Sequence, residues 1–202
     1  MTTIEDLLAT AATDPAAEAW DDLFEQVRHT GVSDSEKALL LERLPAIAGR
    51  FAPAGRDGPL FLAGQLAADL DEDRWPRFHD QLTALRALAA DWLGIPDDAF
   101  LYRLQAAVAL EGDELWGAEL QRIDYGEIEL ECPHCGTDHF ITLGEDDRFA
   151  TRPDTGLGNR LHQLSMDAGR AGVATRLTYL FGHATCPDCG TTFRLSDQVQ
   201  RY

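Results

Sequence analysis

Two short stretches decide how this chain folds: Cys132-Pro133-His134-Cys135-Gly136-Thr137 and Cys186-Pro187-Asp188-Cys189-Gly190-Thr191. Both have the form Cys-Pro-x-Cys-Gly-Thr, and together they contain all 4 cysteines of the sequence. In each stretch the proline restricts the backbone after the first cysteine. The glycine after the second cysteine can take the left-handed conformation that closes a tight turn. Each stretch, which we call a knuckle, is therefore expected to direct two thiols toward one point.

The repeated knuckle predicts one metal site. A single Cys-x-x-Cys pair can serve redox chemistry, but two near-identical copies without a spare cysteine favour a shared ion. A structural zinc site uses four protein ligands, whereas a catalytic site usually keeps one position open. The sequence therefore predicts structural Zn2+ as the cofactor and no catalytic residue. Three histidines lie close to the knuckles and are expected to be ordinary surface residues, with a hydrogen bond to a thiolate as the alternative: His134, His139 and His183. The predicted metal ligands are Cys132, Cys135, Cys186 and Cys189.

Short β signatures flank both knuckles. Residues 127–131 alternate polar and apolar side chains before the first knuckle, residues 139–143 follow it, and residues 192–195 follow the second. The order strand, knuckle, strand occurs twice, across residues 126–143 and 183–195, and this arrangement resembles a zinc ribbon. The resemblance implies the metal and the local fold. It implies no particular function, because ribbons occur in transcription factors, ribosomal proteins, enzymes and interaction modules alike.

A helical insertion is expected inside this ribbon, at about 144–182. The chain places 50 residues between the two cysteine pairs, where roughly 15–20 are common. Apolar residues in the insertion have helical spacing, and Gly169 and Gly172 are expected to divide the helix in two. Asn159 is expected to cap its start and Gly182 its end. Alternation within residues 176–184 leaves a strand there as the alternative.

Residues 1–122 predict an acidic helical domain, and residues 123–202 the ribbon domain with its insertion. Asp14-Pro15 predicts one helix start, Ser33 or Ser35 another, and Pro45 a kink or an early stop. The fold class is therefore mostly α with a small β ribbon (α+β). The helical part is a bundle or a short α-solenoid, which a series of antiparallel helix pairs resembles. The expected helices span about 4–12, 15–30, 33–51, 59–70, 75–93, 95–110 and 113–122.

The charge of the chain restricts its partners. The net charge is −18, of which residues 1–131 carry −17 and residues 132–202 carry −1. Nucleic-acid binders usually show a basic patch, so this distribution argues against nucleic acid as a partner. The acidity either serves solubility or indicates a protein partner with a basic surface. No apolar run reaches the ~20 residues of a membrane span. Residues 1–30 lack the basic start and apolar run of a secretory signal, so we expect a cytoplasmic protein.

Other motifs in the chain do not reach a functional pattern. Gly156-Leu157-Gly158-Asn159 lacks the third glycine and the Lys-Ser/Thr of phosphate loops. Asp71-Glu72-Asp73 and Glu145-Asp146-Asp147 lack the ligand spacing of an EF-hand. The sequence thus predicts a non-enzymatic zinc-binding protein whose helical domain is a protein–protein interaction module braced by the ribbon. Two alternatives stay open: a nucleic-acid or transcription-associated ribbon protein, and a redox-responsive regulator or enzyme that uses the thiols.

Overall fold

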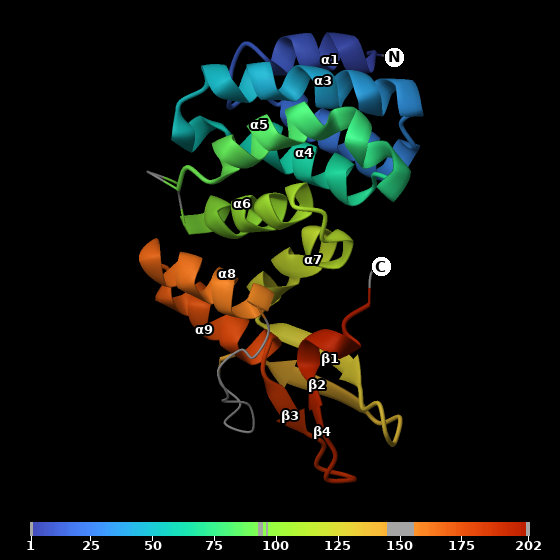
Figure 1. Cartoon of the computed structure of the whole chain (residues 1–202), viewed down its shortest axis with the longest axis vertical. Helices are drawn as coiled ribbons and strands as arrows, with labels where there is room; N and C mark the ends of the chain where they lie inside the picture. Colours follow the sequence, from blue (N-terminus) through green and yellow to red (C-terminus); the bar gives the residue numbers. More distant parts are fainter. Residues whose placement is uncertain (1, 93–94, 96, 145–155, 201–202) are drawn as a thin grey trace. The chain divides into compact units, whose positions relative to one another are not determined.

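The computed structural model describes residues 2–92, 95, 97–144 and 156–200 (Figure 1). The described chain is mostly α-helical with two small antiparallel sheets of two strands each, which confirms the predicted fold class. Its internal contacts divide it into a first unit, Met1–Glu119, and a second unit, Leu120–Tyr202. The division into domains of residues 1–122 and 123–202 stays a prediction.

The first unit is built from helices that pack on helices close to them in the sequence. Helix α3 packs on α4 and α5, and α4 packs on α6 and α7, so successive helices lie one against the next in Figure 1. Buried leucines and alanines of α1 to α5, together with Leu110 of α6, belong to one continuous core. The α-helices are α1 (Ile4–Ala11), α2 (Ala19–Glu25), α3 (Asp34–Arg50), α4 (Asp57–Ala68), α5 (His79–Ala89), α6 (Asp97–Leu110) and α7 (Glu114–Glu119). Short π or 3₁₀ turns are η1 (Gln26–Thr30), η2 (Pro53–Gly55) and η3 (Glu72–Phe78).

Capping boxes fix where α1 and α3 begin. The Asp6 N–H donates to Thr3 Oγ1 over 3.1 Å, and the Thr3 N–H donates back to the Asp6 carboxylate over 3.4 Å. In α3 the Ser33 N–H donates to the Glu36 carboxylate over 2.9 Å, and the Glu36 N–H donates to Ser33 Oγ over 3.4 Å. Each box satisfies two backbone donors that the helix leaves unpaired. Of the two predicted serines, Ser33 is therefore the cap.

The predicted helix start at Asp14-Pro15 is wrong. The Asp14 carboxylate accepts the N–H of Ala16 over 2.9 Å, and the Asp14 carbonyl accepts the N–H of Ala17 over 3.2 Å. These bonds form a turn, because an aspartate side chain readily bonds the backbone two residues on. Helix α2 consequently begins only at Ala19. The predicted end is confirmed, since Gly31 follows η1 with a φ of 71°.

Prolines act differently at two positions of the first unit. Helix α3 runs through Pro45 to Arg50, so of the two predicted effects, a kink or an early stop, the early stop is wrong. The buried Leu44 and Ile47 flank that proline. Burial of such side chains contributes about 1.5–3 kcal/mol each, which offsets the cost of about 3 kcal/mol for a proline inside a helix. The helix predicted over 75–93 is also wrong at its start, because Pro76 lies inside the 3₁₀ turn η3 and α5 begins at His79.

Small residues let three helices approach closely. A Cβ added to Gly64 of α4 would lie 2.8 Å from the Cα of Ala106 in α6. A Cβ on Gly117 of α7 would lie 2.6 Å from the Cα of Ala109, also in α6. Real Cβ atoms do not come this close to a backbone, so α6 is held between α4 and α7 at positions that only glycine fits.

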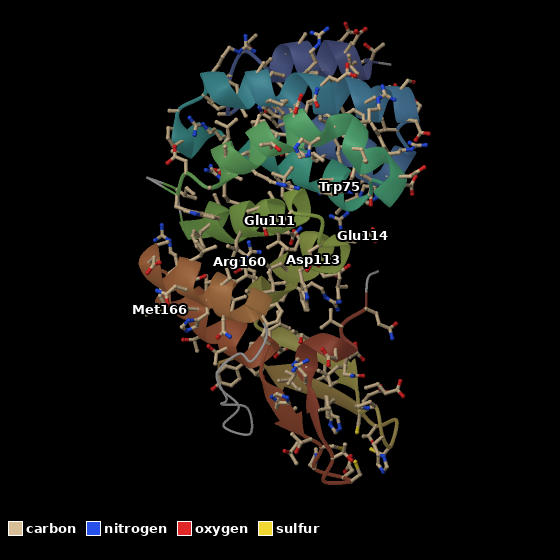
Figure 2. All side chains as sticks on the ribbon, viewed as in Figure 1. Trp75, Glu111, Asp113, Glu114, Arg160 and Met166 are labelled. Carbon is tan, nitrogen blue, oxygen red and sulfur yellow. The ribbon has the colours of Figure 1, made fainter. Side chains whose placement is uncertain are left out.

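Trp75, labelled in Figure 2, covers the turn that joins α6 and α7. Its indole N–H donates to the Leu70 carbonyl over 3.2 Å. The Arg86 guanidinium lies 5.7 Å from its ring centroid, within the range of a cation–π contact. The ring also lies against Gly112, which has a φ of 96°. Trp75 is therefore a packing residue of the first unit.

One arginine is enclosed in the first unit. The side chain of Arg103 in α6 is 0% exposed and forms an ion pair with Asp57, the first residue of α4. Its Nε donates to the Asp57 carboxylate over 2.9 Å. Its terminal nitrogens donate to the carbonyls of Asp91, over 3.2 Å, and Pro53, over 2.8 Å. This network ties the segments before α4 and after α5 to α6.

The second unit consists of two hairpins with a pair of helices between them in the sequence. Strand β1 pairs with β2 and β3 pairs with β4, both antiparallel, and α8 packs on α9, seen in orange in Figure 1. The elements are η4 (Leu120–Tyr125), β1 (Glu127–Glu131), β2 (Asp138–Thr142), α8 (Gly156–Asp167), α9 (Ala171–Leu180), β3 (His183–Thr185), β4 (Thr192–Arg194) and η5 (Leu195–Gln198).

The insertion is helical, with corrections at its ends. Gly169 has a φ of 73° and separates α8 from α9, as predicted, whereas Gly172 lies inside α9, so its predicted role in the break is wrong. Asn159 lies inside α8, which begins at Gly156, so its predicted role as a cap is wrong. Helix α9 ends at Leu180 with Phe181 as its cap, one residue before the predicted Gly182. Residues 176–184, for which both helix and strand were predicted, are thus helix up to Leu180 and strand from His183.

Candidate metal centre

Four thiols converge from the turns of the two hairpins. The Sγ atoms of Cys132 and Cys189 lie 3.8 Å apart, and those of Cys135 and Cys186 lie 3.7 Å apart. All four Sγ atoms lie within 4.8 Å of one another. Two sulfur ligands on a tetrahedral ion with Zn–S bonds of about 2.3 Å would be separated by about 3.8 Å. The donor atoms and their spacing therefore fit a four-coordinate metal ion.

The first knuckle is closed by its own backbone. The Cys132 N–H donates to the Thr137 carbonyl over 2.9 Å, and the Gly136 N–H donates to the Cys132 carbonyl over 3.0 Å. Gly136 has a φ of 71°, a conformation that glycine adopts without strain. The Thr137 hydroxyl lies 3.3 Å from Cys135 Sγ, and its hydrogen bond lowers the pKa of the Cys135 thiol. The turn thus favours the thiolate form that metals bind.

The second knuckle repeats this geometry. The Cys186 N–H donates to the Thr191 carbonyl, and the Gly190 N–H donates to the Cys186 carbonyl, both over 2.9 Å; the φ of Gly190 is 74°. The hydrogen bond between the Thr191 hydroxyl and Cys189 Sγ, at 3.3 Å, lowers the pKa of that thiol to about 6. Burial raises the pKa of Cys186 to about 11. A bound divalent cation would hold every coordinating thiol deprotonated.

Of the three histidines near the knuckles, the structure brings His139 to a sulfur atom. His139 lies on β2, and its Nε2 lies 3.3 Å from Cys186 Sγ. It is half-buried, whereas His134 is exposed within the first knuckle. His183 forms part of β3. The sequence could not choose among them, because the choice follows from the pairing of His139 with Leu130, which sets the face of the hairpin on which His139 lies.

The acidic clusters do not gather into a comparable site among the described residues. Asp71 forms an ion pair of 3.6 Å with Arg74, so part of its charge is compensated on the surface. Glu145, Asp146 and Asp147 lie outside the described residues, and the interpretation of that cluster stays a prediction.

The described helices include none with the length and hydropathy that a membrane span requires. No protein-family model, no curated protein and no solved structure matches this chain. The functional interpretation therefore rests on the thiol cluster and on the surfaces around it.

Proposed function

We propose that this chain is a non-enzymatic zinc-binding protein in which the acidic helical domain acts as a protein–protein interaction module and a zinc ribbon braces it. The proposal is carried by one observation: thiols from two knuckles far apart in the sequence meet at the edge length of a tetrahedral zinc site. The proposed ligands are Cys132, Cys135, Cys186 and Cys189.

The role assigned to the metal is structural. With all four positions of the tetrahedron taken by protein sulfur, no position is left for a substrate or a water molecule. Cys132 and Cys186 are buried, while Cys135 and Cys189 reach the surface. Binding of Zn2+ by such sites contributes about 10–16 kcal/mol, which counts directly as folding free energy. The metal would therefore hold the two hairpins of the second unit together.

The interaction role is supported by charge. Residues 1–131 carry a net charge of −17, a field that repels phosphate and attracts cationic protein surfaces. The predicted partner is therefore a basic protein, which binds without turnover. The alternative functions differ in a measurable way. Nucleic-acid binding that falls steeply with salt would support the transcription-associated role. Zinc loss on mild peroxide with a matching change of activity would support the redox role.

The metal is tested by elemental analysis of freshly purified protein, where we expect one zinc per chain. A chelator should remove the contribution of the second unit to the circular dichroism signal of the chain. It should leave the tryptophan fluorescence largely unchanged, because all 4 tryptophans lie in the first unit. The variants Cys132→Ser and Cys186→Ser should lose zinc. Thr185→Ser, an exposed neighbour of Cys186, should keep it. Full metal content in both cysteine variants would contradict the ligand assignment.

The interaction role is tested by affinity capture with zinc-loaded protein, followed by reconstitution of the complex from purified components. We expect a stoichiometric protein partner and no detectable turnover. The absence of any stoichiometric partner, together with a measured catalytic activity, would overturn the proposal.

A further inference from the structure

One side of the β1–β2 hairpin faces solvent with an uncommon set of side chains. Side chains alternate between the two faces of a strand, and the register pairs Glu127 with Thr142, Glu129 with Phe140 and Glu131 with Asp138. The outer face of the hairpin is defined as Glu127, Glu129, Glu131, Asp138, Phe140 and Thr142.

The orientation of this face is fixed by the opposite face. Ile128 and Leu130 of β1 and Ile141 of β2 are buried. A shift of the register by one residue would expose these three side chains and bury glutamates in their place. The carboxylates therefore cannot turn away from solvent while the hairpin is folded.

The outer face concentrates negative charge. Successive glutamates on β1 are separated by about 7 Å, which is less than the Debye length of about 8 Å at physiological salt. Asp138 lies directly across from Glu131, and like charges at such positions destabilise a sheet. The arrangement costs stability in the isolated chain, and a cationic partner would remove that cost.

An exposed aromatic ring lies among these carboxylates. Phe140 is 70% exposed and directly opposite Glu129. A phenylalanine on the outer face adds nothing to the core, but its ring can receive an aliphatic stem or the face of a guanidinium. The neighbouring glutamate can then hold the charged end of the same side chain.

A groove adjoins the outer face. It has a volume of about 410 Å³, and Glu129, Glu131 and Asp138 line it together with one cation, Arg122. Gln198, the last residue of η5, and the two residues after it also line the groove. The volume falls within the range of about 300–1,000 Å³ of typical ligand pockets. A peptide segment therefore has room to lie along the strand and place side chains in the groove.

We propose that the outer face and its groove bind a basic, extended segment of a protein partner, with arginine or lysine at every second position. An extended peptide repeats its side chains at the same spacing of about 7 Å as the glutamates of β1, so each cation meets one carboxylate while an apolar residue or arginine stem covers Phe140. A second copy of this chain is a poor occupant, because it carries the same charge of −18. This inference goes beyond the helical interaction surface of the proposed function by giving the basic partner a second contact on the ribbon, and it rests on the zinc brace that holds the hairpin.

The test uses the full zinc-loaded chain and two fluorescent peptides of equal composition. One peptide alternates arginine with valine, and the other places its arginines in one block. We expect tighter binding of the alternating peptide by fluorescence anisotropy. The double variant Glu129→Gln/Glu131→Gln should weaken it by at least about tenfold, and Phe140→Ser should weaken it as well. Zinc content and circular dichroism of these surface variants should match the parent.

The matched control is Asp21→Asn/Asp22→Asn, which removes two exposed carboxylates from α2. It should leave peptide binding nearly unchanged. Equal losses in both double variants, equal affinities for both peptides, or preferential binding of a single-stranded oligonucleotide would overturn the proposal. Because zinc content is measured on the same samples, failure of peptide binding with full zinc refutes the docking surface alone. Absence of zinc refutes the proposed brace.

Discussion

Replacing the enclosed arginine of the first unit tests how much the helical part depends on a polar interaction. Arg103→Met keeps an apolar stem and removes the guanidinium, which bonds the Asp57 carboxylate and the carbonyls of Asp91 and Pro53. All three acceptors then lose their donor. Since the arginine side chain is 0% exposed, water cannot take its place without opening the packing around α6.

The expected loss in the free energy of unfolding follows from how far each partner of the ion pair is exposed. Removing one member of a buried ion pair costs about 3–5 kcal/mol. The Asp57 side chain is 30% exposed and can regain water, so we expect about 3 kcal/mol for Arg103→Met. Asp57→Ala leaves the enclosed guanidinium without a counter-charge, so we expect about 5 kcal/mol. The double variant should lose less stability than the two single variants together, because neither charge remains unpaired in it.

The assay is urea unfolding of the zinc-loaded chain, followed by tryptophan fluorescence, which reports the first unit. With a slope of about 2 kcal/mol per molar urea, Arg103→Met should lower the midpoint by about 1.5 M. The control is Arg74→Met, whose ion pair with Asp34 lies on the surface with side chains 42% and 68% exposed; its midpoint should hardly change. Equal shifts in both arginine variants, or strict additivity in the Arg103/Asp57 double variant, would refute the reasoning.

Three further predictions concern the metal centre, the helix contacts and pH. His139→Phe removes the ring nitrogen 3.3 Å from a knuckle thiol and should weaken zinc binding about 10–100-fold in chelator competition; an unchanged curve would contradict its role. Gly117→Ala should lower the melting temperature despite alanine's higher helix propensity, because the added Cβ would lie 2.6 Å from the backbone of α6. Gly49→Ala is the control and should raise the melting temperature, because open space surrounds Gly49. The hydrogen bond from Arg74 lowers the pKa of Asp34, so the stability it provides is present at pH 7 and lost as the pH falls through that lowered value. Because this pair is exposed, Asp34→Asn should lower the urea midpoint at pH 7 only slightly, and that small difference from the parent should disappear as Asp34 becomes protonated in acid.

The sequence predicted best those features that a few neighbouring residues determine. Ser33 and Glu36 form their capping box within one turn, and each knuckle closes through bonds within six consecutive residues. The start predicted at Asp14 failed because two local structures, an aspartate turn and a helix cap, use the same residue type. Pro45 did not stop α3, because tertiary packing on both sides of it outweighs the local preference.

Features that depend on distant residues were not predictable. Arg103 stands in the apolar pattern of α6 as an ordinary helical arginine, and its partner Asp57 is 46 residues away. The selection of His139 among three candidates follows from strand register, and the glycine contacts of α4 and α7 with α6 follow from helix packing. A single sequence carries no direct signal for such pairings.

Because the two knuckles are far apart in the sequence, one pair of thiols is synthesised before the other. Cys186 follows Cys135 by 51 positions, and a ribosome adds about 5–20 residues per second. For roughly 3–10 seconds, the nascent chain presents one half-site whose two thiols have no partners yet. In that interval a passing oxidant or a competing soft metal meets an open dithiol rather than a closed tetrahedron. Under the proposed function, the zinc available while the chain is being synthesised therefore affects how many chains complete the fold of the second unit.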